Sequence, residues 1–165
     1  PYAFGNAWFV DKLDMVDNAD AEIEALNTID PLETAVVDKR FQKDLEGFVP
    51  QKDSTATIVL EEYRPNRLTY KSKADKEQLA VFSEVYYQPG WKATIDGTEV
   101  PHFRADWILR GMRVPAGEHT IVFEFRPSGY VTAAYVSTYS SFLILLLLIA
   151  AIGWSGWKYW EKSKE

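Results

Sequence analysis

Five residues of the types that bind sugars lie close together in the sequence. Trp91 and Trp107 each sit beside a predicted turn, where an indole ring stays partly exposed. An aromatic ring stacks on the apolar face of a sugar, and arginine or carboxylate groups bond the sugar hydroxyls. Arg104, Asp106 and Arg110 supply such groups on neighbouring strands. We take these five side chains as candidate glycan contacts. The alternative is that the aromatic residues fill the core of the domain.

The sequence contains no constellation that predicts catalysis or metal binding. His102 and His119 lie in separate predicted strands without the spacing of metal ligands, so we expect structural roles for both. Glu61 and Glu62 point to opposite faces of one strand and cannot act together on a substrate. The 165 residues include no cysteine, which excludes disulfides and thiolate sites. We therefore assign no catalytic residue, no metal and no cofactor to this chain.

The middle of the chain, residues 54–127, has the two-residue periodicity of β-strands. Asp96-Gly97 stands between two alternating runs and predicts a type I′ hairpin, which needs positive φ at both positions. Gly111, alone within a strand, indicates a bulge or a close backbone approach. Many short strands separated by turns predict a mainly β domain. Its fold is an antiparallel β-sandwich with jelly-roll-like or immunoglobulin-like strand order.

Residues 1–53 predict a short strand-helix-strand segment that packs on the sandwich. Asp17 or Asn18 can cap the helix, because its side-chain oxygen accepts from free amides of the first turn. Acidic residues in that turn, Glu22 among them, suit the positive end of the helix dipole. Ile23 and Leu26 are expected to pack inward.

The C-terminal part has no charged residue from Pro127 to Trp157. A helix needs roughly 20 apolar residues to cross a bilayer, so residues 130–160 predict a transmembrane helix that contacts lipid through residues 137–160. Its apolar positions run all round the helix, which suits lipid better than the surface of a small domain. Lysine follows the span at three positions, as the positive-inside rule expects of a cytoplasmic end. We therefore expect residues 161–165 to form a cytoplasmic tail and the β-domain to be extracytoplasmic.

The charge of the chain narrows its partners. Its net charge is −6 and its basic residues are scattered, whereas phosphate binding draws on clustered lysine and arginine. Nucleic acid is therefore not an expected partner.

Residues 86–97, with the sequence YYQPGWKATIDG, resemble a signature near the C-terminus of YfhO-like bacterial membrane proteins. Further matching pieces are found at residues 5–10, 104–107, 110–111, 114–121 and 125–127. The pattern that begins Pro-Gly-Trp and the Val-Pro-Ala-Gly-Glu-His run are specific in combination.

The resemblance implies a function that the residues alone do not. Proteins of this family are similar to multi-spanning glycosyltransferases that use a polyprenyl-phosphate-linked sugar outside the bacterial inner membrane. Their catalytic acids lie in loops between early membrane helices, so none is carried over to this chain. We expect the chain to be the C-terminal, non-catalytic accessory domain and last helix of such an enzyme. Its expected partners are a cell-envelope glycan or polyprenyl-linked sugar, and the rest of the same polypeptide.

Two other functions remain open. The sandwich can be purely structural, or it can bind another protein while the helix anchors it at the membrane. A tethered hydrolytic enzyme is disfavoured, because the sequence shows no acid–base pair with suitable spacing.

Overall fold

The computed structural model describes residues 4–164, apart from the side chains at positions 128, 130, 131 and 161. The chain forms two units, one ending at Phe125 and one beginning at Arg126. The first unit contains all the described strands together with two short helices, and the second is a single long helix.

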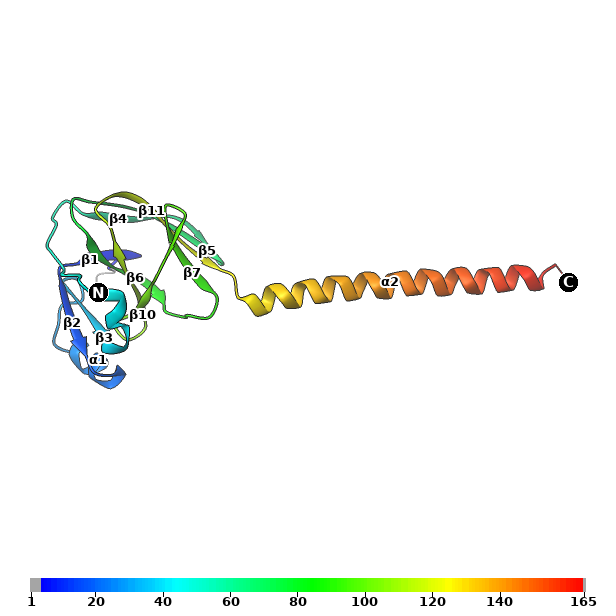
Figure 1. Ribbon diagram of the computed structural model, residues 1–165, viewed down its shortest axis with the longest axis horizontal. Coiled ribbons are helices and arrows are strands. Elements are labelled where there is room, and N and C mark those ends of the chain that lie inside the picture. The colour runs from blue at the N-terminus through cyan, green and yellow to red at the C-terminus, as the bar shows by residue number, and fades with distance from the viewer. Residues whose placement is uncertain (1–3, 165) are drawn as a thin grey trace. The chain divides into compact units, whose positions relative to one another are not determined.

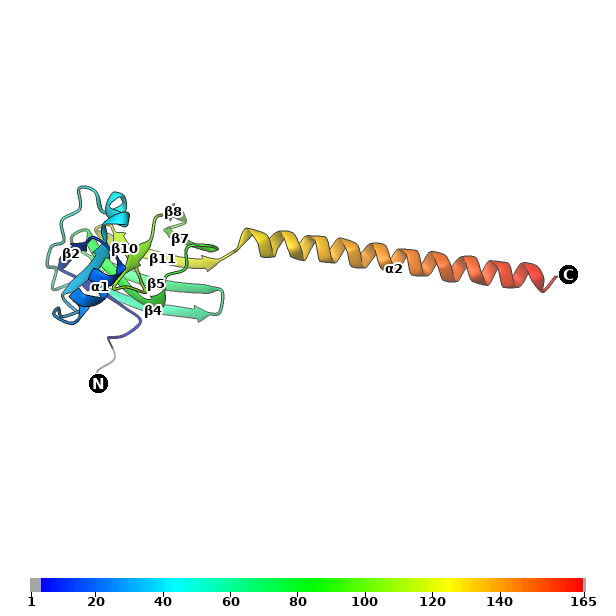
Figure 2. The ribbon, with the colours of Figure 1, turned by 90° about the horizontal axis from the view of Figure 1, so that it is seen from below.

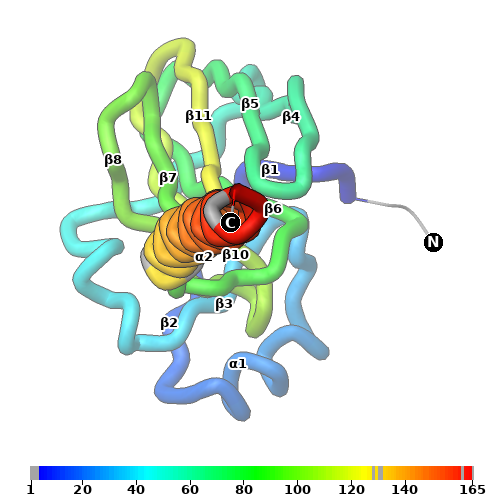
Figure 3. Tube along the Cα trace, turned by 90° about the vertical axis from the view of Figure 1, so that its right-hand side faces the viewer, coloured from blue at the N-terminus to red at the C-terminus, as the bar shows by residue number. Residues whose placement is uncertain are grey.

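The first unit contains two antiparallel sheets. One has four strands in the order β1-β6-β10-β9 and the other has five in the order β4-β5-β11-β7-β8. Figure 3 shows the five strands of the second sheet in their order from β8 to β4. Figure 2 shows β4, β5 and β11 running side by side. The predicted mainly β, antiparallel sandwich is confirmed. The strands are β1 (Ala7–Val10), β4 (Thr57–Arg64), β5 (Arg67–Ala74), β6 (Gln78–Val85), β7 (Trp91–Ile95), β8 (Thr98–Val100), β9 (Phe103–Ala105), β10 (Leu109–Val114) and β11 (Gly117–Phe125).

The four-stranded sheet is covered on both faces, which gives the unit two hydrophobic cores. Ala80 and Phe82 of β6 face the five-stranded sheet, where they pack with residues of β5, β7 and β11. Leu79 and Val81 face the opposite way and pack against the N-terminal segment. Alternate residues of β6 therefore enter different cores, and this explains why the strand is continuously apolar from Leu79 to Phe82.

The N-terminal segment forms the third layer. It comprises a parallel pair, β2 (Lys12–Val16) with β3 (Thr34–Asp38), the helix α1 (Ala19–Leu26) and the 3₁₀ helix η1 (Lys39–Leu45). Figure 1 shows β2, β3 and α1 on the side of β6 and β10 that faces away from β4 and β11. The segment's β1 instead joins the four-stranded sheet as the neighbour of β6.

The capping of α1 is as predicted, but its buried face is not. Asn18 Oδ1 accepts from the backbone N–H groups of Asp20 and Ala21 at 3.1 and 3.0 Å. Ile23, expected to pack inward, is 38% exposed, whereas Glu22 is completely buried. The helix is turned so that a carboxylate, rather than the isoleucine, faces the domain.

The Asp-Gly hairpin forms as predicted between β7 and β8. Asp96 and Gly97 have φ values of +50° and +83°. Asp96 Oδ1 accepts from the N–H of Thr120, and Asp96 Oδ2 lies 2.6 Å from His119 Nδ1. The carboxylate raises the pKa of His119, so this histidine stabilises the turn, in keeping with its expected structural role.

The second unit is the helix α2 (Ser128–Lys162). Its residues Thr132–Trp160 are long and apolar enough to cross a membrane, and none of that stretch is buried within the protein. At 1.5 Å per residue, 29 residues extend about 43 Å, which exceeds a hydrocarbon core of about 30 Å. The predicted C-terminal apolar helix is confirmed.

A substitution at Gly111 tests how closely β9 and β10 pack. A Cβ at this position would lie 2.5 Å from Cε2 of Phe103, and the ladder shifts register between Leu109 and Arg110. Gly111→Ala should therefore lower the free energy of unfolding by about 1–3 kcal/mol, the usual cost of overpacking. Urea unfolding of the full chain in detergent micelles, followed by near-ultraviolet circular dichroism, measures this change.

A matched control is Gly156→Ala, because a Cβ there meets nothing within 4 Å. Adding Phe103→Leu to Gly111→Ala should recover part of the loss. An unchanged unfolding midpoint in Gly111→Ala would contradict the close packing.

Candidate functional site

The five predicted glycan contacts fall into two separate groups. Arg104, Asp106 and Trp107 lie together at the connection from β9 to β10, against the N-terminal segment. Trp91 and Arg110 lie together at the end of the sandwich core. The structure therefore brings the five residues to two places, each with its own chemistry.

The first group forms a buried ionic cluster around Glu22, which we call the Glu22 cluster. Arg104 Nη2 lies 2.6 Å from Glu22 Oε2 and 3.7 Å from Asp38 Oδ2. Glu22 Oε1 accepts from the backbone N–H of Trp107 at 2.8 Å. These contacts fasten α1 to the β9–β10 connection. The cluster therefore has a clear structural task, while ligand contact by Arg104 and Trp107 stays a prediction.

Asp106 occupies a strained backbone position in the Glu22 cluster. Its φ is +48°, and its neighbour Trp107 follows at +70°. Its backbone N–H donates to Val36 O, and its Oδ1 accepts from Val36 N–H, both at 2.8 Å. Its Oδ2 is buried without a hydrogen-bond partner among the described residues. Burial raises the pKa of this carboxyl to about 6.

The sequence did not single out Glu22 as a functional residue. Its partners Arg104 and Trp107 are 82 and 85 residues away in the chain, so no local pattern connects them. The sequence signal for a buried Glu22 was weak: its carboxylate occupies a helical position, next to Ile23, that can face the domain.

The second group places a cation inside the sandwich. Arg110 has the same orientation on β10 as Met112 and Val114, whose side chains enter the core between the sheets. Its side chain is 98% buried, and its Nε donates to Val85 O at 3.0 Å. The guanidinium carbon lies 4.1 Å from the centroid of the Trp91 ring and 5.1 Å from that of Phe123. Burial lowers the pKa of Arg110.

Trp91 separates this buried cation from a surface groove, which we call the Trp91 groove. The groove has a volume of about 410 Å³ and lies between η1, the β6–β7 loop and the β7–β8 hairpin. Tyr86, Trp91 and His102 give it aromatic surface, and burial lowers the pKa of His102 to about 4. The other lining residues are Arg40, Phe41, Asp44, Gln88, Lys92, Ala93, Glu99, Val100 and Pro101.

The Trp91 groove is better suited to binding than to acid–base catalysis. Two carboxylates, Asp44 and Glu99, line it, and burial raises the pKa of Asp44. Glu99, however, is paired at 2.9 Å with Lys92 on the neighbouring strand, where both side chains are exposed. Aromatic surface with polar groups at its margin is typical of a site that holds a ligand in place.

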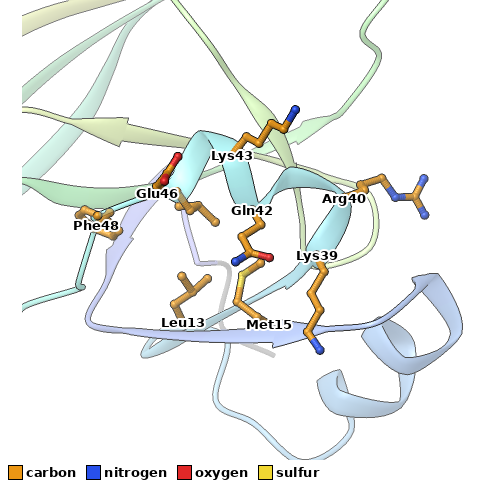
Figure 4. A pocket seen from close by; sticks show the side chains of 10 residues that line it. Leu13, Met15, Lys39, Arg40, Gln42, Lys43, Glu46 and Phe48 are labelled. Atoms are coloured by element: carbon orange, nitrogen blue, oxygen red, sulfur yellow. The ribbon is translucent and has the colours of Figure 1, made fainter.

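A larger groove of about 650 Å³ lies between β2 and η1 (Figure 4). Leu13 and Met15 of β2 form its apolar floor, Gln42 of η1 lies above Met15, and the basic side chains of η1 lie at the margin. Lys39 is paired with Asp17, and Arg40 with Asp38, so the charge of this margin is largely neutralised. None of the five predicted contacts lines this groove.

Comparison with known proteins identifies a protein family. The family model described as bacterial membrane protein YfhO matches residues 39–137, which is more than half of the chain. The matched region includes the Trp91 groove, the Arg110 side chain and the start of α2. No curated protein and no solved structure matches the chain.

The raised pKa of Asp106 predicts how stability depends on pH. Since the pKa in the folded state, about 6, exceeds the ordinary 3.8, the folded protein binds this proton more tightly than the unfolded chain does. The free energy of unfolding should therefore decrease as pH rises from about 4 to about 6. The decrease is on the order of 3 kcal/mol, at about 1.4 kcal/mol per pKa unit.

Asp106→Asn should remove this contribution and stabilise the protein at pH 7. The amide oxygen still accepts from Val36 N–H, and asparagine tolerates positive φ. Urea unfolding of variant and wild type between pH 4 and 7 measures the difference, with the exposed Asp14→Asn as control. Parallel pH profiles for Asp106→Asn and wild type would contradict the assignment.

Proposed function

Because the chain belongs to the YfhO family of bacterial membrane proteins, we propose that its β-domain is a non-catalytic, glycan-binding accessory domain anchored by α2. The domain acts on the extracytoplasmic side of the cell membrane. It holds or orients a glycan or lipid-linked acceptor for a membrane glycosyltransferase, the activity that the family resemblance implies.

The observation that carries this proposal is the Trp91 groove. Trp91 is partly exposed and forms part of the groove wall, together with Tyr86. The polar margin contains hydrogen-bond donors and acceptors, which Gln88, Lys92 and Glu99 supply. Rings for stacking and polar groups for hydroxyls are the two components that sugar recognition requires.

The second candidate function is a protein-interaction domain. The groove between β2 and η1 favours it, because its floor of Leu13 and Met15 is apolar and its volume exceeds that of the Trp91 groove. Exposed apolar surface of this kind commonly marks contact with another protein segment. Under this alternative, the domain braces other parts of the same polypeptide.

The proposed orientation rests on charge. Lys158, Lys162 and Lys164 follow the apolar part of α2. Basic residues near the end of a span favour the cytoplasmic side, and large folded domains translocate largely regardless of their charge. We therefore place the C-terminus in the cytoplasm and the β-domain outside.

Glycan binding is tested on the full chain in detergent micelles, labelled with 5-fluorotryptophan. Soluble oligosaccharides of cell-envelope type should shift the ¹⁹F resonance of Trp91, identified by its absence in Trp91→Phe. Trp91→Ala should weaken binding on the order of 5- to 150-fold, if stacking of a sugar is worth about as much as the 1–3 kcal/mol of a base on an aromatic ring.

Trp107→Ala is the matched control, because Trp107 is 43% exposed but belongs to the Glu22 cluster. Binding that depends on Trp107 and not on Trp91 would move the site to that cluster. If no oligosaccharide perturbs either indole, the protein-interaction function replaces the glycan-binding one.

Orientation is tested by cysteine labelling, for which the absence of native cysteine leaves no background. Thr98→Cys on the β7–β8 hairpin should react with a membrane-impermeant maleimide in intact cells. Ser163→Cys should react only after the membrane is permeabilised. The reverse pattern would overturn the proposed orientation.

A further inference from the structure

Arg110 is a buried cation without an ion-pair partner. Its side chain is 98% buried, yet no carboxylate lies within 4.0 Å of its guanidinium among the described residues. Its Nη1 is buried and has no hydrogen-bond partner in the same part of the chain. Among the described residues, its side chain makes one hydrogen bond, from Nε to the carbonyl of Val85, besides the ring contacts. Buried charges are ordinarily paired or fully hydrogen-bonded, because desolvation costs several kcal/mol.

Two more polar atoms near Arg110 lack partners. The hydroxyl of Tyr70 and Nε2 of His102 are both buried without a hydrogen bond among the described residues. Arg110, Tyr70 and His102 all surround the ring of Phe123. Its centroid lies 5.1 Å from the guanidinium carbon, 6.2 Å from the Tyr70 ring and 5.6 Å from the His102 ring. Three orphaned polar groups of this kind in one region call for an occupant.

These groups adjoin the Trp91 groove. His102 and Trp91 both line the groove, and the guanidinium stacks on the Trp91 ring. Trp91 also contacts Phe125, with ring centroids 5.3 Å apart, so it covers the end of the core where the guanidinium lies. Because the Trp91 ring lies between the groove and the guanidinium, a ligand in the groove reaches Nη1 only when the Trp91 side chain moves.

The nearest structural explanation is compensation by Glu84. This carboxylate acts on Arg110 through space and partly offsets its burial, but it does not reach ion-pair distance. Glu84 is half-buried at the end of β6 and remains available to water. It reduces the cost of the buried charge and leaves the donor at Nη1 free.

We propose that the ligand of the Trp91 groove is an anionic saccharide, whose carboxylate or phosphate oxygen accepts a hydrogen bond from Arg110. This inference rests on the proposed glycan-binding function and adds the chemical class of the ligand. The Tyr70 hydroxyl is a second donor for the anion, because burial raises the pKa of this phenol and keeps it protonated. The sugar ring stacks on the Trp91 ring after that ring has moved from its place between the groove and the guanidinium. Arginine retains its charge when buried, so the site accepts anions at every physiological pH.

The first experiment uses matched saccharides on the full chain in micelles, with the Trp91 ¹⁹F resonance as the readout. Trigalacturonate and glucose 1-phosphate are compared with neutral cellotriose and glucose. Trigalacturonate represents a carboxylate source and glucose 1-phosphate a phosphate source. The anionic ligand of at least one pair should bind about tenfold or more tightly than its neutral counterpart, as expected for a charge-assisted hydrogen bond.

Arg110→Met should abolish this preference and should not lower the unfolding midpoint, because an apolar side chain of similar length avoids the desolvated charge. Arg113→Met is the matched control on the same strand, since Arg113 is paired with Glu77 away from the groove. It should keep the preference for anions.

A second measurement separates this inference from the proposed function. Inorganic phosphate and acetate should raise the thermal midpoint of the wild type and not that of Arg110→Met. Equal binding of acidic and neutral sugars, both lost in Trp91→Ala, would overturn the anionic ligand and leave glycan binding intact. If no saccharide binds but phosphate still stabilises only the wild type, the anion site stands and the glycan function fails. If Arg110→Met and Glu84→Gln both lower the thermal midpoint, and phosphate and acetate do not change the midpoint of the wild type, the role of Arg110 is structural.

Discussion

The four-stranded sheet needs a cover on both faces, and most of the domain's architecture follows from this requirement. Leu79 and Val81 of β6 are fully buried on the side away from the five-stranded sheet, so the N-terminal segment has to pack there. That packing places η1 beside the β7–β8 hairpin, where Arg40 and Asp44 become one wall of the Trp91 groove. The Glu22 cluster holds the same layer at its other end, through Arg104. The Trp91 groove is thus a by-product of covering a sheet.

Sequence reasoning succeeded where the determining contacts are local. The Asp96-Gly97 hairpin, the Asn18 cap, the strand periodicity and the apolar helix all depend on residues within a few positions of one another. It failed for α1, because Glu22 takes its orientation from Arg104, 82 residues away. It grouped five candidate contacts by their proximity in sequence, whereas strand pairing divides them between two sites. The alternation of Arg110 with Met112 and Val114 is visible in the sequence, but it was not used to predict a buried arginine.

The two groups of candidate residues treat charge in opposite ways. In the Glu22 cluster, the largely buried charge of Arg104 is paired with two carboxylates, those of Glu22 and Asp38. At Arg110 the charge is buried against aromatic rings, and its free donor remains inside the protein. Fold stability alone favours the first arrangement. The arrangement at Arg110 has a physical rationale when a bound molecule accepts the hydrogen bond from its free donor.

The strand order of the five-stranded sheet also bears on the synthesis of the protein. Its central strand, β11, is the last strand in the chain, with β5 on one side and β7 on the other. Ribosomes deliver the chain from the N-terminus, so the sheet stays divided into two hairpins until residues 117–125 emerge. Only two residues separate that strand from Ser128, where α2 begins. Completion of the sheet and delivery of the apolar helix to the membrane therefore occur within moments of each other, and unpaired edges of β5 and β7 are exposed until then.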